Sequence, residues 1–159
     1  MRSLMIGTAA AWIMLSTAFA GTVTPRDGWV VTDTSHSFAA LVQRLETAVK
    51  AEKMGLVNFA SASEGAKALG VTIPGNRVVG VFRNDFAQRM LKASVAAGIE
   101  APIRFYLTEN PDGMATLSYR KPSAVFQPYF DEGGEALRTL AAELDAIFAR
   151  IAQGATATN

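Results

Sequence analysis

Five side chains near the ends of predicted strands have the types needed to hold a small ligand: Asn84, Arg104, Tyr106, Tyr119 and Arg120. Arginine offers planar cationic donors, tyrosine an aromatic face with a polar tip, and asparagine both donors and an acceptor. Alternate residues of a strand share a face, so Arg104 and Tyr106 point together, whereas Tyr119 and Arg120 point apart. These five residues predict a pocket for a small anionic or planar molecule. The alternative is structural, with the tyrosines as core or sheet-edge aromatics and Arg104 paired with a carboxylate.

Catalytic sets are incomplete. His36 is the only histidine, so it cannot form a histidine-rich metal site, and its place between two serines at a predicted helix start favours a polar contact there over catalysis. Ser63 and Lys67 are spaced one residue too far apart for an S-x-x-K nucleophile, and no G-x-S-x-G occurs. An enzyme that uses Tyr119, Arg104 or His36 stays open as an alternative.

Metal and cofactor motifs are also missing from the sequence. The nearest acidic pairs, Asp131-Glu132 and Glu143 with Asp145, are interpreted as solvated, and residues 110–113 as a turn rather than a calcium loop. No glycine-rich phosphate loop or cysteine occurs. We therefore expect no metal and no cofactor.

The elements that must position these residues alternate in type along the chain. Strands are expected at residues 28–32, 56–60, 77–82, 103–108 and 114–120, and helices at about 38–55, 61–69, 84–98 and 135–153. This order predicts an α+β fold, in which an antiparallel sheet of about five strands has helices packed on one face.

Local signals refine the predicted helices. Ser61 and Glu64 have capping-box spacing, and Asn84 is expected to cap the third helix. The inner face of that helix should consist of Phe86, Met90, Leu91 and Val95. Residues 131–134 are expected to form a hinge before the last helix. The apolar stripe of that helix favours completion of the core over pairing with a second copy, although a homodimer stays open.

Residues 1–20 have the pattern of a secretory signal. Arg2 precedes an apolar run of 12 residues, which is shorter than the about 20 that a membrane span needs, and Ala18-Phe19-Ala20 places small residues at the cleavage positions. We expect cleavage between Ala20 and Gly21 and a periplasmic or secreted product without a membrane anchor. Residues 21–154 should form one domain, and residues 155–159 a frayed tail.

The mature composition excludes further classes of protein. Without Arg2, the chain has 14 basic and 14 acidic side chains, so the basic surplus of a nucleic-acid binder is missing. Without cysteine, an exported chain of this length must draw its stability from its core rather than from disulfides.

Three segments resemble the family catalogued as domain of unknown function 302. They are Phe82-Arg83-Asn84-Asp85, the stretch from Ala101 to Leu107, and Asp112-Gly113 with the stretch from Ser118 to Pro122. The resemblance covers roughly residues 28–130, and it implies a compact sheet-and-helix domain whose activity is unknown.

The chain departs from that family's pattern at three positions. Ala62 stands where the family often has histidine, and Arg83 and Asp85 replace the glycine and proline that flank the family's asparagine. Any family chemistry that used the histidine should be missing here. We expect a non-enzymatic exported protein that binds a small ligand or a protein partner; a structural or assembly role through the last helix is a further alternative.

Overall fold

The structure, a computed structural model, describes residues 23–158, so the predicted signal segment and Asn159 lie outside it. Within these residues one five-stranded sheet has the strand order β1-β5-β4-β3-β2, and every neighbouring pair is antiparallel. The strands are β1 (Trp29–Ser37), β2 (Gly55–Ala60), β3 (Asn76–Phe82), β4 (Ile103–Glu109) and β5 (Met114–Arg120). The α-helices are α1 (Phe38–Ala51), α2 (Ala62–Ala68), α3 (Asn84–Ala93), α4 (Pro122–Phe126) and α5 (Phe130–Thr156), with short 3-10 turns at Ala96–Glu100 and Gln127–Tyr129.

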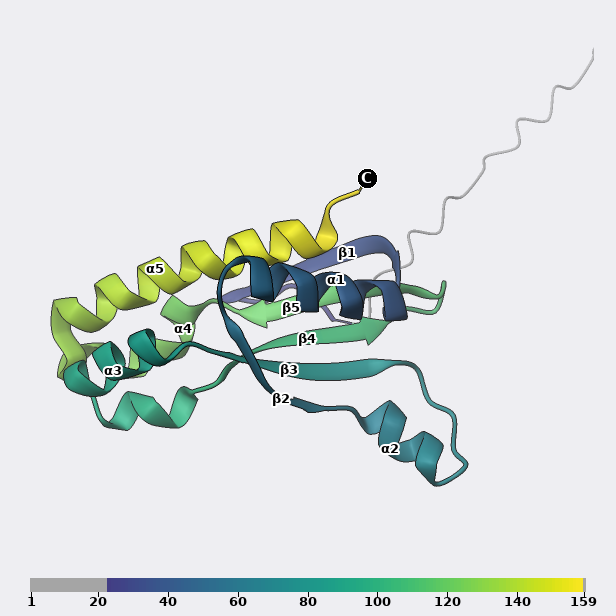
Figure 1. The fold of residues 1–159 in the computed structure, drawn as a ribbon, viewed down its shortest axis with the longest axis horizontal. Coiled ribbons are helices and arrows are strands. Elements are labelled where there is room, and N and C mark those ends of the chain that lie inside the picture. Colours follow the sequence, from purple (N-terminus) through teal and green to yellow (C-terminus); the bar gives the residue numbers. More distant parts are fainter. Residues whose placement is uncertain (1–22, 159) are drawn as a thin grey trace, which may run out of the picture.

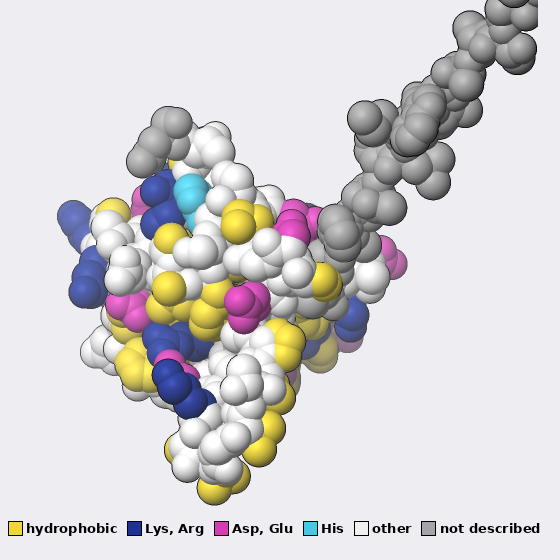
Figure 2. Space-filling model, turned by 90° about the vertical axis from the view of Figure 1, so that its right-hand side faces the viewer, with side chains coloured by type: hydrophobic (Ala, Val, Ile, Leu, Met, Phe, Trp, Pro, Cys, Tyr) yellow, Lys and Arg dark blue, Asp and Glu magenta, His cyan; other side chains and the backbone are white. Residues whose placement is uncertain are grey.

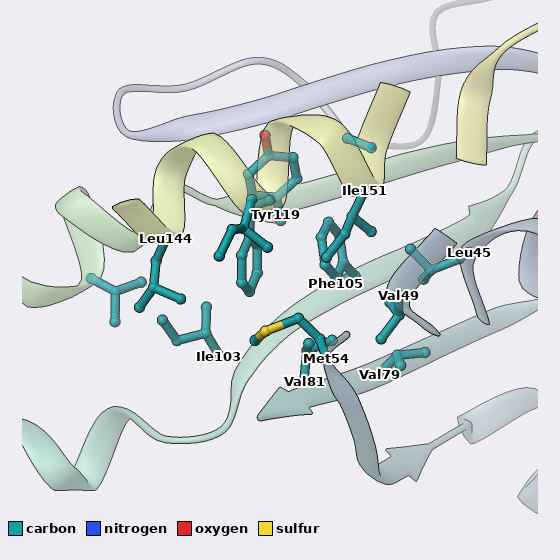
Figure 3. Close-up of a cluster of buried hydrophobic side chains, with 14 of the residues drawn as sticks. Leu45, Val49, Met54, Val79, Val81, Ile103, Phe105, Tyr119, Leu144 and Ile151 are labelled. Carbon is teal, nitrogen blue, oxygen red and sulfur yellow. The ribbon is translucent and has the colours of Figure 1, made fainter. Parts of the chain in front are cut away.

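Helices α1 and α5 lie beside each other across one face of the sheet (Figure 1). Alternate residues of the central strands point into this layer, among them Phe105 and Leu107 of β4 and Leu117 of β5, each at most 1% exposed. Phe105 lies in the middle of this buried cluster (Figure 3), and its ring stacks on that of Phe148 of α5, with 4.7 Å between centroids. The predicted α+β fold with helices on one face is confirmed.

The apolar stripe of α5 is used inside the chain. Its large side chains are at most 8% exposed, namely Leu137, Leu140, Leu144, Ile147, Phe148 and Ile151. The helix therefore completes the core, because no part of this stripe is left for a second copy.

Both ends of α5 differ from the predicted helix. At Gly134 the backbone has φ 55° and ψ −150°, which places a kink at the predicted hinge. At the other end the helix continues through Thr156 instead of fraying from Ala155. Arg44 of α1 holds this end, because its Nε donates to the Ala155 carbonyl at 2.8 Å and its Nη2 to that of Ala157 at 2.6 Å.

Two further elements differ in length from their prediction. Strand β1 continues to Ser37 because, as an edge strand, it tolerates the polar residues that follow Thr32, and the Thr34 hydroxyl donates to the Ala115 carbonyl at 2.7 Å. Helix α3 ends at Ala93, where Ser94 is extended, so Val95 is 75% exposed and Leu91 46% exposed. The predicted inner face of α3 was therefore wrong at these two residues and right at Phe86 and Met90.

Helix α2 projects from the end of the sheet beyond β2. The predicted serine cap is confirmed, since the Ser61 hydroxyl accepts from the Glu64 amide at 3.1 Å. No residue of α2 is buried, and Leu69 and Val71 behind it are 84% and 52% exposed. Figure 2 shows hydrophobic side chains along this projecting part of the molecule. Between residues 23 and 158 no helix combines the length and the apolar character that crossing a membrane requires.

Candidate functional site

The sheet face opposite α1 and α5, called the open face below, carries an ordered set of polar and aromatic side chains. The register pairs Trp29 of β1 with Arg120 of β5, and Gly80 of β3 with Arg104 of β4. Two residues after Arg104 on β4, Tyr106 pairs with Val78 of β3 on one side and with Ser118 of β5 on the other. Because paired residues share a face, the side chains of these strands lie together although they come from distant parts of the sequence.

These side chains line a hollow of about 550 Å³ that extends from the start of β4 and the end of β5 to the start of β3 and of α2. The lining includes Trp29, Val78, Glu100, Arg104, Tyr106 and Arg120. This volume falls within the range of small-molecule sites, which is roughly 300–1,000 Å³. We call this cavity the sheet-face hollow.

Four of the five residues predicted to form a pocket line the sheet-face hollow: Arg104, Tyr106, Tyr119 and Arg120. The fifth, Asn84, is not among its lining residues. Asn84 is the first residue of α3, and the position before the helix belongs to Arg83, with no side-chain capping bond. Arg83 instead donates to the Asp85 carboxylate at 2.7 and 3.1 Å. The predicted cap was therefore wrong.

The two arginines of the hollow are not neutralised by acidic partners. Arg104 makes no hydrogen bond or ion pair with any residue between 23 and 158, and Arg120 Nη2 donates to the neutral carbonyl of Ala124 at 3.1 Å. The predicted alternative, a carboxylate paired with Arg104, is thus not found in this part of the chain. Glu100 also lines the hollow, but its carboxylate accepts from the Tyr129 hydroxyl at 2.9 Å.

Two aromatic rings add apolar surface beside the arginines. Trp29 is held at the edge of the sheet, where the Arg26 guanidinium lies 5.1 Å from the centre of its ring. Tyr106 lies on the same face of β4 as Arg104, as predicted from strand alternation. Within the described chain, no hydrogen bond engages the indole nitrogen of Trp29 or the hydroxyl of Tyr106. Both side chains therefore keep polar groups available to a ligand.

Tyr119 belongs mainly to the core. It is 4% exposed and lies beside Phe105 in the core (Figure 3). Its ring centroid is 5.0 Å from that of Phe105 and 5.7 Å from that of Phe148. Burial raises the pKa of its phenol, and the negative charge of Asp145 raises it further. The predicted structural alternative therefore describes Tyr119 better than a role as an acid or a base.

His36 lies away from the hollow. Its Nε2 is 3.0 Å from the Ala157 carbonyl, beside the Arg44 contacts, so it makes a polar contact with the end of α5 rather than with the start of α1. The start of α1 is capped by Ser37, whose hydroxyl accepts from the Ala40 amide at 3.4 Å. His36 is seven residues from Trp29 along β1, which corresponds to roughly 20 Å. The structure does not combine His36 with Tyr119 or Arg104.

Glu143 and Asp145, one of the two predicted acidic pairs, have structural partners. Glu143 accepts two bonds from Arg89, both at 2.7 Å, and Asp145 accepts from the Ser123 amide at 2.9 Å, which caps the start of α4. Across residues 23–158 no three His, Asp or Glu side chains gather closely enough to hold a metal ion.

Sequence reasoning missed Trp29, Val78 and Glu100 as parts of the site. Trp29 was placed on a strand, but its position next to Arg120 follows from the pairing of β1 with β5, which joins the two ends of the domain. Glu100 lies in a 3-10 turn that has no clear sequence signal. Only the strand order could have brought these residues together.

Comparisons with known proteins support the fold. No curated protein matches the sequence. Among solved structures, the chain is similar to one described as an uncharacterized conserved protein DUF302 from Bacillus stearothermophilus, with a TM-score of 0.69 and 19% identity over 81% of this chain and 99% of that one. The sequence profile of Domain of unknown function DUF302 matches residues 30–153, which extends the predicted resemblance through α5. The chain therefore belongs to the DUF302 family.

Proposed function

We propose that the protein is an exported binding protein without enzymatic activity, and that its sheet-face hollow holds a small molecule. The observation that carries this proposal is a hollow of about 550 Å³ whose two arginines lack acidic partners among the described residues. Cationic side chains that nothing neutralises are energetically unfavourable close together, unless a bound group satisfies them. The remaining lining combines aromatic and aliphatic surface with a few polar groups, which is typical of ligand sites.

The proposal is tested most directly through Trp29, because it is the only tryptophan after residue 20 and it lines the hollow. Protein beginning at Gly21 is purified from its native envelope and examined by native mass spectrometry. It is then titrated with a metabolite panel while thermal stability and tryptophan emission are followed. Bound mass, or a stability gain that coincides with a change in Trp29 emission, supports binding in the hollow. A chain that carries no ligand and responds to none contradicts it.

A pair of variants on α2 separates the hollow from the rest of the surface. Ala62 is exposed and lines the hollow, so Ala62→Phe should fill part of it without entering the core. Ala68→Phe places the same ring on the same helix, at an exposed residue that does not line the hollow. Ligand responses that are reduced in the first variant and preserved in the second place the ligand in the hollow. Equal responses in both variants would place it elsewhere.

Enzymatic activity is the competing function. A general acid or base contributes at least about 100-fold to turnover, so removal of Tyr119, Arg104 or His36 should lower turnover by that factor if one of them acts in this role. No observation favours this function, because His36 contacts the end of α5 and Tyr119 is packed in the core. An assembly role through α5 is disfavoured for a similar reason, since its apolar stripe is buried within the chain.

Export is the second part of the proposal, and it rests on the sequence of residues 1–20. Amino-terminal sequencing of protein from the envelope or medium should give Gly21 as the first residue. Ala20→Phe should block processing, because the cleavage position requires a small side chain, whereas Phe19→Leu should leave it intact. Recovery of Met1 from a cytosolic fraction would contradict export.

A further inference from the structure

Arg104 and Arg120 both line the hollow, from the neighbouring strands β4 and β5. The pairing of these strands begins with Phe105 opposite Tyr119, and extension of this register by one residue brings Arg104 and Arg120 level with each other on the open face. Like charges at such positions destabilise a sheet. The two arginines therefore contribute two positive charges to the lining of the hollow.

Only one negative charge of the described chain faces this pair. Glu100 is the single carboxylate among the described lining residues, and it is engaged by the Tyr129 hydroxyl at 2.9 Å. Two arginines and one glutamate leave the lining with one net positive charge. A ligand with one negative charge would neutralise the hollow, whereas a phosphate monoester, with a charge of about −1.5 to −2, would leave a negative excess beside Glu100.

Apolar surface begins directly next to the charged pair. Trp29 is the neighbour of Arg120 in the same row of the sheet, and Tyr106 follows Arg104 on the same face of β4. Beyond Tyr106, Val78 and Ala60 form a register pair on the same face. A ligand with its charged group at the arginines would therefore lay an apolar body over these side chains.

We propose that the sheet-face hollow is a monocarboxylate site, in which Arg104 and Arg120 hold the carboxylate and Trp29 and Tyr106 contact an aromatic or aliphatic body. This inference rests on the proposed binding function and specifies its ligand class. The planar donors of guanidinium match the two oxygens of a carboxylate, and such charge-assisted pairs are roughly twice as strong as neutral hydrogen bonds.

Three probes that share a phenyl ring test the charge of the ligand: 3-phenylpropionate, its neutral amide 3-phenylpropanamide, and 2-phenylethyl phosphate. Each is titrated into the mature chain while Trp29 emission is recorded. The carboxylate should bind at least about tenfold more tightly than the amide, since hydrogen bonds to charged groups contribute about 1.5–3 kcal/mol. This preference should shrink as ionic strength rises.

Variants assign the preference to the arginine pair. Arg104→Gln and Arg120→Gln should each lower carboxylate affinity by more than amide affinity and so abolish most of the carboxylate preference, whereas Arg104→Lys, which keeps the charge without the planar donors, should recover part of it. Lys92→Gln is the matched control, because it removes one positive charge from an exposed residue of α3 that does not line the hollow. If circular dichroism shows that a glutamine variant does not fold, two other measurements test the role of the arginines. They are the affinity of Arg104→Lys for the carboxylate and the dependence of carboxylate binding on ionic strength.

The outcomes separate this inference from the proposed function. Equal affinities for the carboxylate and the amide would overturn the proposed contact of Arg104 and Arg120 with the carboxylate. The proposed binding of a small molecule in the sheet-face hollow would remain. Tightest binding of the phosphate ester would overturn the monocarboxylate class. If no probe of this series changes Trp29 emission, the proposed contact of the two arginines with a carboxylate is overturned. The metabolite panel described above then tests the binding function separately.

Discussion

Tyr119 illustrates at the residue scale how one side chain can line a cavity and still serve the core. Its ring packs against both Phe105 of β4 and Phe148 of α5. Burial, with the charge of Asp145 as a second cause, raises the pKa of its phenol, so the folded state holds the phenolic proton more tightly than the unfolded chain does. The neutral ring therefore contributes stability at and below neutral pH.

A first prediction concerns truncation of this ring. Tyr119→Ala should lower the free energy of unfolding by about 3–5 kcal/mol, as is usual when a buried aromatic side chain is removed. Tyr119→Phe keeps the ring and should change stability by less than about 1.5 kcal/mol. Urea denaturation of both variants at pH 7 measures the difference. Similar losses in the two variants would mean that the hydroxyl, rather than the ring, carries the stability.

A second prediction concerns alkaline pH. Because the folded pKa of Tyr119 is raised, its contribution is complete below the unfolded pKa of about 10 and is lost as the pH rises above it. Tyr119→Phe should therefore lose less stability than the parent between about pH 9 and pH 11. Tyr106→Phe, at a residue with an accessible hydroxyl on the open face, is the control. Parallel alkaline curves for the parent and Tyr119→Phe would contradict this account.

At the scale of the elements, the Arg89–Glu143 pair connects α3 with α5 through two hydrogen bonds, both 2.7 Å long. The hydrogen bond from Arg89 is the main cause that lowers the pKa of Glu143. The pair therefore contributes stability above the unfolded glutamate pKa, and this contribution is lost as the pH falls through the folded pKa. Both side chains are more than 40% exposed, so solvent screening limits the gain.

The third prediction is that Glu143→Gln costs less than about 1 kcal/mol at pH 7 and flattens the loss of stability below about pH 4. Glu132→Gln, at an exposed residue for which the described chain provides no ion pair, should leave the acid dependence unchanged. Denaturation curves across pH 2–7 compare the two variants. A larger acid effect in Glu132→Gln would refute the assignment to the α3–α5 pair.

Two glycines allow a fourth prediction about the kink in α5. A Cβ atom at Gly134 or at Gly65 of α2 would have no heavy atom within 4 Å. Only Gly134 has a positive φ, so Gly134→Ala should cost about 1–3 kcal/mol through backbone strain alone. Gly65→Ala lies inside a helix and should be neutral or stabilising by up to about 1 kcal/mol. Equal changes in melting temperature would show that the kink is not maintained by the glycine.

The sequence predicted the elements better than their edges. Apolar periodicity identified the long helices, because burial on one face dictates the pattern, and β-branched runs and turn residues identified the five strands. It could not identify α4, whose start is capped by Asp145 from a distant helix, or the exposure of Leu91, which depends on where α3 packs. Four predicted site residues line one hollow because two adjacent strands carry them, whereas Trp29 depends on the closure of the sheet by β1.

At the scale of the whole molecule, the strand order places the first strand of the sheet beside the last one in the sequence. Strand β1 pairs with β5, and α1 packs against α5 over the sheet. Truncation after Gly133 would uncover the helix-covered side of β4 and β5, including Phe105.

The fifth prediction is that a chain of residues 21–133 does not fold. Circular dichroism should show loss of cooperative melting, and light scattering should show aggregation, because a large part of the core lies on α5. A chain of residues 21–157, which keeps the carbonyl that Arg44 binds, is the control and should melt like a chain of residues 21–159. A folded monomer after truncation at Gly133 would refute completion of the core by α5.

The pairing of β1 with β5 also determines when folding can be completed during synthesis. The first strand must wait for its partner, which lies about 85 residues later, and α1 must wait for a helix that ends at Thr156. A nascent chain therefore remains without its closing contacts until almost all of it has left the ribosome. Such late closure would suit the proposed export, because a polypeptide that crosses a translocation pore must stay unfolded while it passes.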